Sequence, residues 1–305
     1  MTPPLIFDRL LLRARRQRGL RLGPETFLID QVAGELAQRL RLVLRRFDLA
    51  ADLGTPTAAV RMAIRRDGAV GAMIAADPVI AAAPSVAGDD AASLRVAADE
   101  EALPFGDATL DLVVSALALQ AVNDLPGALA QIRRALKPDG LFLAALFGGE
   151  TLSELRHSLA VAESELDGGT SPRVAPFADV REMGALLQRA GFALPVTDVD
   201  RITVRYSSPF RLLRDLRCMG AANALVERRR VPLRRATLMR AMDVYAERFA
   251  DPDGKVRASF DIVWLSGWSP HESQQQPLRP GSAKQRLADA LGATEVSTGE
   301  NKPDR

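Results

Sequence analysis

The sequence of 305 residues has very few of the side chains that bind metals or form disulfides. It contains one cysteine, Cys218, and two histidines, His157 and His271. A single cysteine excludes an intramolecular disulfide and favours a reducing compartment. No Cys-x-x-Cys pair is present to build a zinc site, and an iron site of two histidines and one carboxylate would need both histidines to converge. We therefore predict no metal site.

The chain also lacks an excess of charge of one sign. Its 40 Lys and Arg residues stand against 38 Asp and Glu residues, which leaves a formal net charge of +2. So small an excess creates no general field that would attract a polyanion. We therefore predict no nucleic-acid partner.

No long hydrophobic run is present at the N-terminus. Residues 1–22 contain apolar Leu10, Leu11 and Leu12, but Arg9 and Arg13 interrupt them. This stretch is too short and too charged for a signal peptide or a membrane span. We expect an exposed basic helix. The alternatives are peripheral contact with an anionic membrane or an acidic partner, or a mitochondrial address if the source is eukaryotic.

Short apolar runs alternate with helical segments over the first part of the chain, which favours a parallel sheet covered on both faces. The clearest helix lies in 124–140, where an apolar stripe follows Asp124 and the sequence Pro-Asp-Gly ends it. The expected strands are 47–54, 71–77, 93–99, 110–119 and 140–148.

Beyond residue 150 the pattern changes to helices before two late strands. The late strand at 259–268 follows a long helical block, so this block reads as an insertion before the last strand. A polar tail closes the sequence and is expected to lack a fixed structure. The expected helices are 151–166 and 179–192, the helical block spans about 210–249, and the other late strand is 195–206. The expected parts are a basic helical extension (1–45), one main domain (46–268) with its insertion (about 206–258) and the tail (269–305).

Carboxylates follow the first three expected strands. In doubly wound sheets ligands bind beyond the carboxyl ends of the strands. Asp77, after the second strand, could accept both ribose hydroxyls of a nucleoside, or it could cap a helix that begins at Pro78. The loop after Gly54 reads Thr-Pro-Thr-Ala-Ala and lacks the glycines that a pyrophosphate needs. This loop favours S-adenosylmethionine, which has no phosphates, over a dinucleotide.

The motifs resemble a known family. "ADLG", the acid after the second strand and "ADEEALPFGDATLDLVVSALALQAVNDLPGALAQIRRALKPDGLF" are similar to class I S-adenosylmethionine-dependent methyltransferases of type 11, including the carrier-protein O-methyltransferase of biotin synthesis. "IFDR", "FGGETLSELRHSLAVAESELDGGTSPRVAPF", "DGKVRASFDIVWLSGW" and "HESQQQPLRPGSA" resemble the complex I assembly factor 5 group and its bacterial relatives. The resemblance implies an α/β fold: a doubly wound, mostly parallel seven-stranded sheet with a helical insertion before the last strand.

The resemblance also implies how S-adenosylmethionine would bind. Asp52 would lie near the methionine amino group with the backbone of Gly54 against it, and Asp77 would take the ribose hydroxyls. Asp99 would accept from the adenine amine while the backbone of Glu100 reaches the ring. The pocket floor would run from Ser115 to Leu119. The resemblance indicates no catalytic residue.

The sequence departs from the family pattern at two places. Thr55-Pro56-Thr57 replaces a Cys-Gly-x-Gly loop, which removes two glycines and one backbone donor, so the loop must follow a different path. Gln120-Ala121 replaces a His-Trp pair.

Three functions therefore stay open: transfer of a methyl group to a protein side chain during respiratory complex I assembly, arginine hydroxylation as described for a member of the group, and a non-catalytic assembly role that uses the arginine-rich segment 227–235. The partner would be a protein substrate or a complex I subunit. The location would be the cytoplasm for a bacterial source, or the mitochondrial matrix or inner-membrane periphery for a eukaryotic one.

Overall fold

The computed structural model describes residues 5–66, 68–79, 94–275 and 292. The chain divides into two compact units, Met1–Pro270 and His271–Arg305. In the second unit, the described part contains a turn in which the Nδ1 atom of His271 lies 2.7 Å from the hydroxyl of Ser273. Most of the tail expected from residue 269 onward lies outside the described residues. The following description concerns the first unit.

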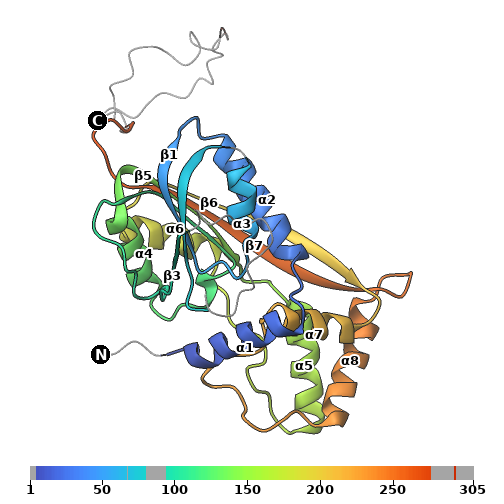
Figure 1. Ribbon diagram of the computed structural model, residues 1–305. Coiled ribbons are helices and arrows are strands. Elements are labelled where there is room, and N and C mark those ends of the chain that lie inside the picture. The colour runs from blue at the N-terminus through green and yellow to red at the C-terminus, as the bar shows by residue number, and fades with distance from the viewer. Residues whose placement is uncertain (1–4, 67, 80–93, 276–291, 293–305) are drawn as a thin grey trace, which may run out of the picture. The chain divides into compact units, whose positions relative to one another are not determined.

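The first unit contains one seven-stranded sheet with the order β3-β2-β1-β4-β5-β7-β6 (Figure 1). The pairs from β3 to β5 are parallel, whereas β7 is antiparallel to both β5 and β6. This order confirms the expected doubly wound, mostly parallel sheet. The strands are β1 (Phe47–Leu53), β2 (Val70–Ala76), β3 (Leu94–Val96), β4 (Leu110–Ala116), β5 (Leu136–Phe147), β6 (Ala193–Tyr206) and β7 (Val256–Trp268).

Helices cover both faces of the sheet, as the apolar strands require. Successive residues of a strand point to opposite faces, so Leu112 and Val114 of β4 pack in one hydrophobic cluster while Val113 packs in the other. The first cluster includes α2 (Phe27–Arg41) and α3 (Ala59–Arg65), and the second includes α4 (Leu125–Ala135) and α6 (Val180–Arg189). Because α2 buries one whole face, it belongs to the main core.

Helix α4 shows how local sequence sets an element's bounds. The carboxylate of Asp124 accepts a hydrogen bond from the backbone N–H of Gly127 at 2.9 Å, which satisfies a free donor of the first turn. Leu129 and Ile132 on the buried stripe are fully covered. The helix gives way directly to β5 at Leu136, so the expected helix is confirmed with an earlier end.

The remaining helices gather near the carboxyl ends of the parallel strands (Figure 1). They are α1 (Arg9–Leu22), α5 (Ser153–Leu166), α7 (Pro209–Cys218) and α8 (Arg235–Phe249). Helices α7 and α8 form the expected insertion between β6 and β7. The helical block expected over about 210–249 consists of two separate helices, because α7 ends before Gly220, whose φ is +72°, and residues 219–234 are not helical.

Among the described residues, we find no helix that combines the length and the apolar character needed to cross a membrane.

Candidate functional site

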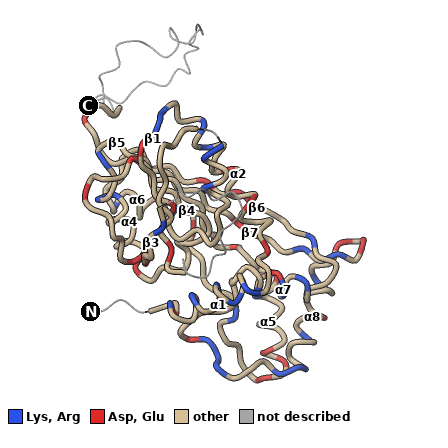
Figure 2. The backbone as a smooth tube through the Cα atoms, in the orientation of Figure 1, with Lys and Arg blue, Asp and Glu red and all other residues tan. Residues whose placement is uncertain are grey.

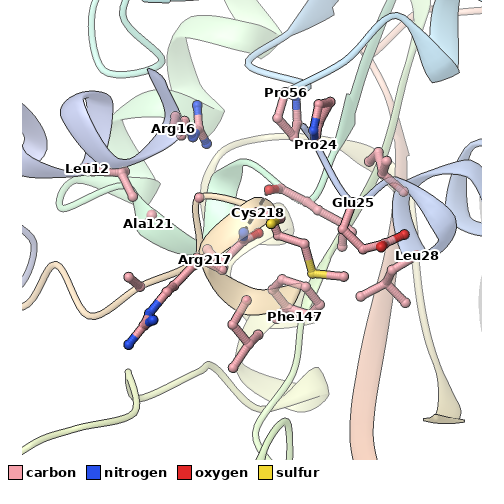
Figure 3. Close-up of a pocket in the computed structure, with 18 of the residues that line it drawn as sticks. Leu12, Arg16, Pro24, Glu25, Leu28, Pro56, Ala121, Phe147, Arg217 and Cys218 are labelled. Atoms are coloured by element: carbon pink, nitrogen blue, oxygen red, sulfur yellow. Dashed lines mark hydrogen bonds between the residues drawn. The ribbon is translucent and has the colours of Figure 1, made fainter. Parts of the chain in front are cut away.

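A cavity of about 710 Å³ opens where β1, β2, β4 and β5 end (Figure 3). Leu12 and Arg16 of α1, Glu25 of the connection to α2, and residues of α5 and α7 contribute to its wall. Pockets that bind small molecules commonly measure about 300–1,000 Å³. This cavity therefore has the size of a pocket that binds a small molecule.

Asp77 is the only one of the seven predicted cofactor-binding residues that lines this cavity. Its carboxylate accepts a hydrogen bond from the backbone N–H of Val79 at 2.5 Å. Burial raises the pKa of Asp77, although the nearby guanidinium of Arg16 opposes this shift. The position agrees with the predicted role toward ribose hydroxyls, which stays a prediction.

Asp52 lies behind the cavity wall rather than in it. Its side chain is fully buried, accepts a hydrogen bond from the hydroxyl of Thr55, and pairs with the Nη1 atom of Arg61 at 2.7 Å. Burial raises the pKa of Asp52 to about 6 even though Arg61 and Thr55 stabilise the charged form. Asp52 therefore fixes two residues that line the cavity, Thr55 and Arg61.

The Thr-Pro-Thr loop follows the different path that its sequence requires. Gly54 has a φ of +69°, whereas Thr55, Pro56 and Thr57 do not have positive φ angles. The hydroxyl of Thr55 also accepts a hydrogen bond from the backbone N–H of Ala116 at 3.1 Å, so it ties the loop to the end of β4. The hydrogen bonds of Thr55 therefore hold this loop in place, where the family pattern has flexible glycines.

Gly54 is required by its protein neighbours. A Cβ atom at this position would lie 2.6 Å from the Oε1 atom of Glu100 and 3.0 Å from the Cβ of Ala118. Protein atoms thus already approach this glycine closely.

Asp99 and Glu100 are engaged by α1. The Nη2 atom of Arg9 lies 2.8 Å from Oδ1 of Asp99 and also pairs with Glu100, and Arg13 pairs with Asp99. The Nη1 atom of Arg16 is 3.4 Å from Oε1 of Glu100. Figure 2 shows the basic residues along α1. Both acids lie outside the cavity wall, so their predicted contacts with adenine stay untested.

Ser115 and Leu119 also lie outside the wall of the cavity. The hydroxyl of Ser115 donates to the carbonyl of Leu53 at 2.7 Å, and Leu119 is buried in the core. Leu117 and Gln120 line the cavity instead. Leu117 has a φ of +51°, and such backbone strain, which costs about 1–3 kcal/mol, is concentrated at ligand sites.

Three cavity residues were not among the predicted cofactor-binding residues. Arg16, Arg61 and Gln120 line the cavity, and two of their atoms, the donor Nε of Arg61 and the acceptor Oε1 of Gln120, are buried without a hydrogen-bond partner among the described residues. Buried polar atoms without partners mark a place where a ligand could bind. Arg16 left a signal, because Arg9, Arg13 and Arg16 are spaced to share one face of a helix. Gln120 left one as a departure from the family pattern, and Arg61 left none.

Within the described ranges, no three His, Cys, Asp or Glu side chains gather in a way that could hold a metal ion.

Comparison with known proteins identifies the family. Residues 51–144 match the family described as "Methyltransferase domain". The chain is 42% identical to the mitochondrial arginine hydroxylase NDUFAF5 of Homo sapiens over 281 residues, which cover 91% of this chain and 81% of that protein. The chain belongs to the NDUFAF5 family. The NDUFAF5 protein of Danio rerio is 38% identical and covers 93% of this chain.

More distant similarities reach enzymes outside the NDUFAF5 family. The malonyl-[acyl-carrier protein] O-methyltransferase of Halorhodospira halophila is 39% identical over 173 residues, which cover 57% of each protein. The solved structure of YcgJ from Bacillus subtilis superposes with a TM-score of 0.53 over 77% of this chain and 98% of that one. At 16% identity, this second likeness concerns the fold alone.

Proposed function

We propose that this chain modifies an arginine side chain of a partner protein, and that its cavity binds S-adenosylmethionine. The reaction is hydroxylation, for which dioxygen would supply the inserted oxygen atom and a two-electron reductant would convert the other oxygen atom to water. The observation that carries the reaction is the 42% identity to an arginine hydroxylase over 91% of the chain. The cavity at the carboxyl ends of the strands supports binding of the cofactor, because this edge is where doubly wound sheets bind ligands.

The residues of the cavity fit the chemical groups of S-adenosylmethionine. Asp77 offers a carboxylate for two ribose hydroxyls, and Arg16 and Arg61 offer cations for the carboxylate of the methionine part. The Oε1 atom of Gln120 is a buried acceptor without a donor among the described residues. When bound, the cofactor supplies an electrophilic methyl group.

Methyl transfer is the second candidate reaction. The methyltransferase domain over residues 51–144 favours it, and the cavity has room to align an acceptor nitrogen with a methyl donor. We propose a subunit of respiratory complex I as the protein acceptor. For a eukaryotic source we propose the mitochondrion, the location in the names of the NDUFAF5 relatives, and for a bacterial source the cytoplasm.

The cofactor proposal is tested by calorimetric titration with S-adenosylmethionine. We expect the wild type to bind and Asp77→Asn to bind about 10- to 100-fold more weakly, because a hydrogen bond to a charged group contributes about 1.5–3 kcal/mol. Asp107→Asn is the matched control, since Asp107 is 74% exposed and outside the cavity, and it should bind as the wild type does. Equal affinities for wild type and Asp77→Asn would contradict the assignment.

The reaction is tested by measuring the intact mass of candidate acceptor subunits after incubation with the enzyme. One sample contains dioxygen and a two-electron reductant, and the other contains S-adenosylmethionine. A gain of one oxygen atom supports hydroxylation, and a gain of one methyl group supports the second candidate. An acceptor that binds tightly but keeps its mass under all conditions would support the non-catalytic assembly role instead.

A further inference from the structure

The guanidinium of Arg61 lies in the cavity wall, and the protein uses only part of it. Arg61 belongs to α3 and lines the cavity, and its side chain is 11% exposed. Its Nη1 atom lies 2.7 Å from the Oδ2 atom of Asp52. Among the described residues, neither Nη2 nor Nε of Arg61 has a hydrogen-bond partner. A guanidinium carries five N–H donors, so most donors of Arg61 remain available to a ligand.

The two unpaired nitrogen atoms of Arg61 share one edge of the guanidinium. The Nε–H and Nη2–H bonds of an arginine run parallel and can donate two hydrogen bonds to one carboxylate. Arg201 shows this geometry in the same chain, because its Nε and Nη2 atoms lie 2.7 and 3.0 Å from the two carboxylate oxygen atoms of Asp261. The edge of Arg61 therefore matches a planar carboxylate.

Two other arginines of the cavity wall are already held by buried acids. Both Nε and Nη2 of Arg173 donate to Glu163, so the same edge of Arg173 is occupied. The Nη1 atom of Arg16 lies 3.4 Å from the fully buried carboxylate of Glu100. Arg61 differs from Arg173 because its acidic partner binds Nη1 and leaves the Nε–Nη2 edge unpaired.

The remaining charges of the wall are of both signs. Arg95 and Arg217 are exposed, and an exposed guanidinium forms only weak ion pairs because water competes for it. The carboxylates in the wall belong to Glu25, Asp30 and Asp77. They repel a ligand carboxylate, but they favour the amine that an amino acid carries beside its carboxylate. The wall as a whole therefore suits a zwitterionic group rather than a single charge.

Asp52 can act on a ligand only through Arg61. Its side chain is fully buried behind the wall, where one oxygen atom accepts from the hydroxyl of Thr55 and the other pairs with Arg61. The resemblance places this acid near the methionine amino group, whereas here both of its oxygen atoms are engaged by the protein. A guanidinium that is already fixed loses less conformational freedom when a ligand binds. Asp52 thus holds Arg61 ready for a ligand.

We propose that the Nε–Nη2 edge of Arg61 is the subsite for the carboxylate of the cavity ligand, and that Asp52 is its positioning residue. This inference rests on the proposed function, because it deepens the proposed binding of S-adenosylmethionine. The methionine carboxylate binds Arg61 side-on, as Asp261 binds Arg201. The cavity therefore selects its ligand by the carboxylate, and neither Arg61 nor Asp52 takes part in bond breaking.

Calorimetric titration with two ligands tests the subsite without turnover. The probes are S-adenosylmethionine and decarboxylated S-adenosylmethionine, which keeps the amine but lacks the carboxylate. We expect the wild type to bind S-adenosylmethionine at least about tenfold more tightly than the decarboxylated compound, since two charge-assisted hydrogen bonds depend on the carboxylate. Arg61→Met should bind the two compounds with affinities within about twofold of each other, because methionine has no donor.

Asp52→Asn separates the positioning role from direct contact with the ligand. Both compounds carry the amine, so direct contact between Asp52 and the amine would make this variant bind both of them more weakly. We expect instead an unchanged affinity for the decarboxylated compound and a smaller preference for S-adenosylmethionine, because asparagine holds Arg61 without a charge. An equal loss of affinity for both compounds would overturn the positioning role.

Arg66→Met is the matched control, because Arg66 is an exposed residue at the end of α3 and lies outside the cavity. It should keep the full preference. An Arg61→Met variant that keeps the preference would overturn the subsite. If Arg61→Met fails to fold because Asp52 is left unpaired, as far-ultraviolet circular dichroism would reveal, Arg61→Lys decides. Lysine supplies a charge to Asp52 but no second nitrogen atom, so a full preference in this variant overturns the proposal.

The subsite and the cofactor proposal fail in different ways. A wild type that binds both compounds equally keeps the cofactor and removes the subsite. A wild type that binds neither compound removes the cofactor proposal and the subsite with it. The reaction on the acceptor arginine is tested separately, because the mass of the acceptor subunit reports it.

Discussion

At the scale of single residues, Gly54 is required for two different reasons, its backbone conformation and the space around it. Its positive φ costs any other residue about 1–2 kcal/mol, and a Cβ would also meet the side chain of Glu100 at 2.6 Å. Glu100 cannot easily move away, because Arg9 and Arg16 hold its carboxylate. We expect Gly54→Ala to lower the free energy of unfolding by about 2–4 kcal/mol, with overpacking added to the backbone cost, as measured by urea denaturation.

Gly168 provides the matched control for this prediction. It has a positive φ of +71°, close to that of Gly54, but a Cβ there would meet nothing within 4 Å. Gly168→Ala should therefore cost only the backbone part, about 1–2 kcal/mol. Equal losses in the two variants would mean that Glu100 does not press on Gly54 in solution.

Single residues also show which features of the site the sequence could predict and which it could not. The sequence indicated that Gly54 and Asp77 matter, because their types and positions after strands are local features. It could not indicate that Glu100 packs on Gly54 or that Arg61 pairs with Asp52, because side-chain packing in the folded chain decides these contacts. The sequence could not indicate that the Oε1 atom of Gln120 lacks a donor among the described residues either, because this depends on which donors the fold brings near it.

At the scale of elements, helix α1 is held to the sheet by its arginines. The carboxylate of Glu100 is fully buried and pairs with Arg9, and its other partner, Arg16, is 3.4 Å away. Removing one partner of a buried ion pair commonly costs about 3–5 kcal/mol, because the remaining charge stays buried. We expect Arg9→Met to lower the free energy of unfolding by about 3 kcal/mol in urea denaturation.

Arg134→Met is the control for α1. Arg134 and Asp107 form an ion pair at 3.0 Å whose side chains are 53% and 74% exposed, and exposed pairs contribute about 0–1 kcal/mol. If Arg9→Met lowered the free energy of unfolding as little as the control does, the ion pair with Glu100 would not be what holds α1 in place.

The elements themselves were largely predictable, because their signals are local. Apolar runs bounded by turn residues predicted the strands, and Asp124 with its apolar stripe predicted α4. The break inside the helical block at 210–249 was not predicted, and it has a physical cause. Periodicity did not locate the break, whereas the fold places Gly220 against the backbone of Arg16 on α1. A contact between residues so far apart in the chain leaves no local pattern.

At the scale of the first unit, the inserted helices share one core with the sheet. The hydrophobic cluster that contains Leu112 of β4 also contains Leu212 of α7 and Tyr245 of α8. Tyr245 is fully buried, and its hydroxyl donates to the carbonyl of Arg257 in β7 at 2.7 Å. Because one core joins these parts, we expect the insertion and the sheet to unfold together.

Two probes of unfolding test this coupling. Both tryptophans of the chain, Trp264 and Trp268, lie in β7 and report on the sheet, whereas far-ultraviolet circular dichroism reports mainly on the helices. We expect the two urea transitions of the wild type to coincide. In Tyr245→Ala both signals should report a free energy of unfolding that is lower by about 3–5 kcal/mol, since loss of a buried aromatic side chain leaves a cavity.

Met239→Ala in the same helix is the control, because Met239 is 43% exposed. This variant should change the free energy of unfolding by no more than about 0.5 kcal/mol with either signal. Tyr245→Ala could instead lose its helical signal while the tryptophan signal keeps its wild-type midpoint. That result would mean that the insertion folds independently of the sheet. The cavity between them would then have a wall that can unfold without the rest of the unit.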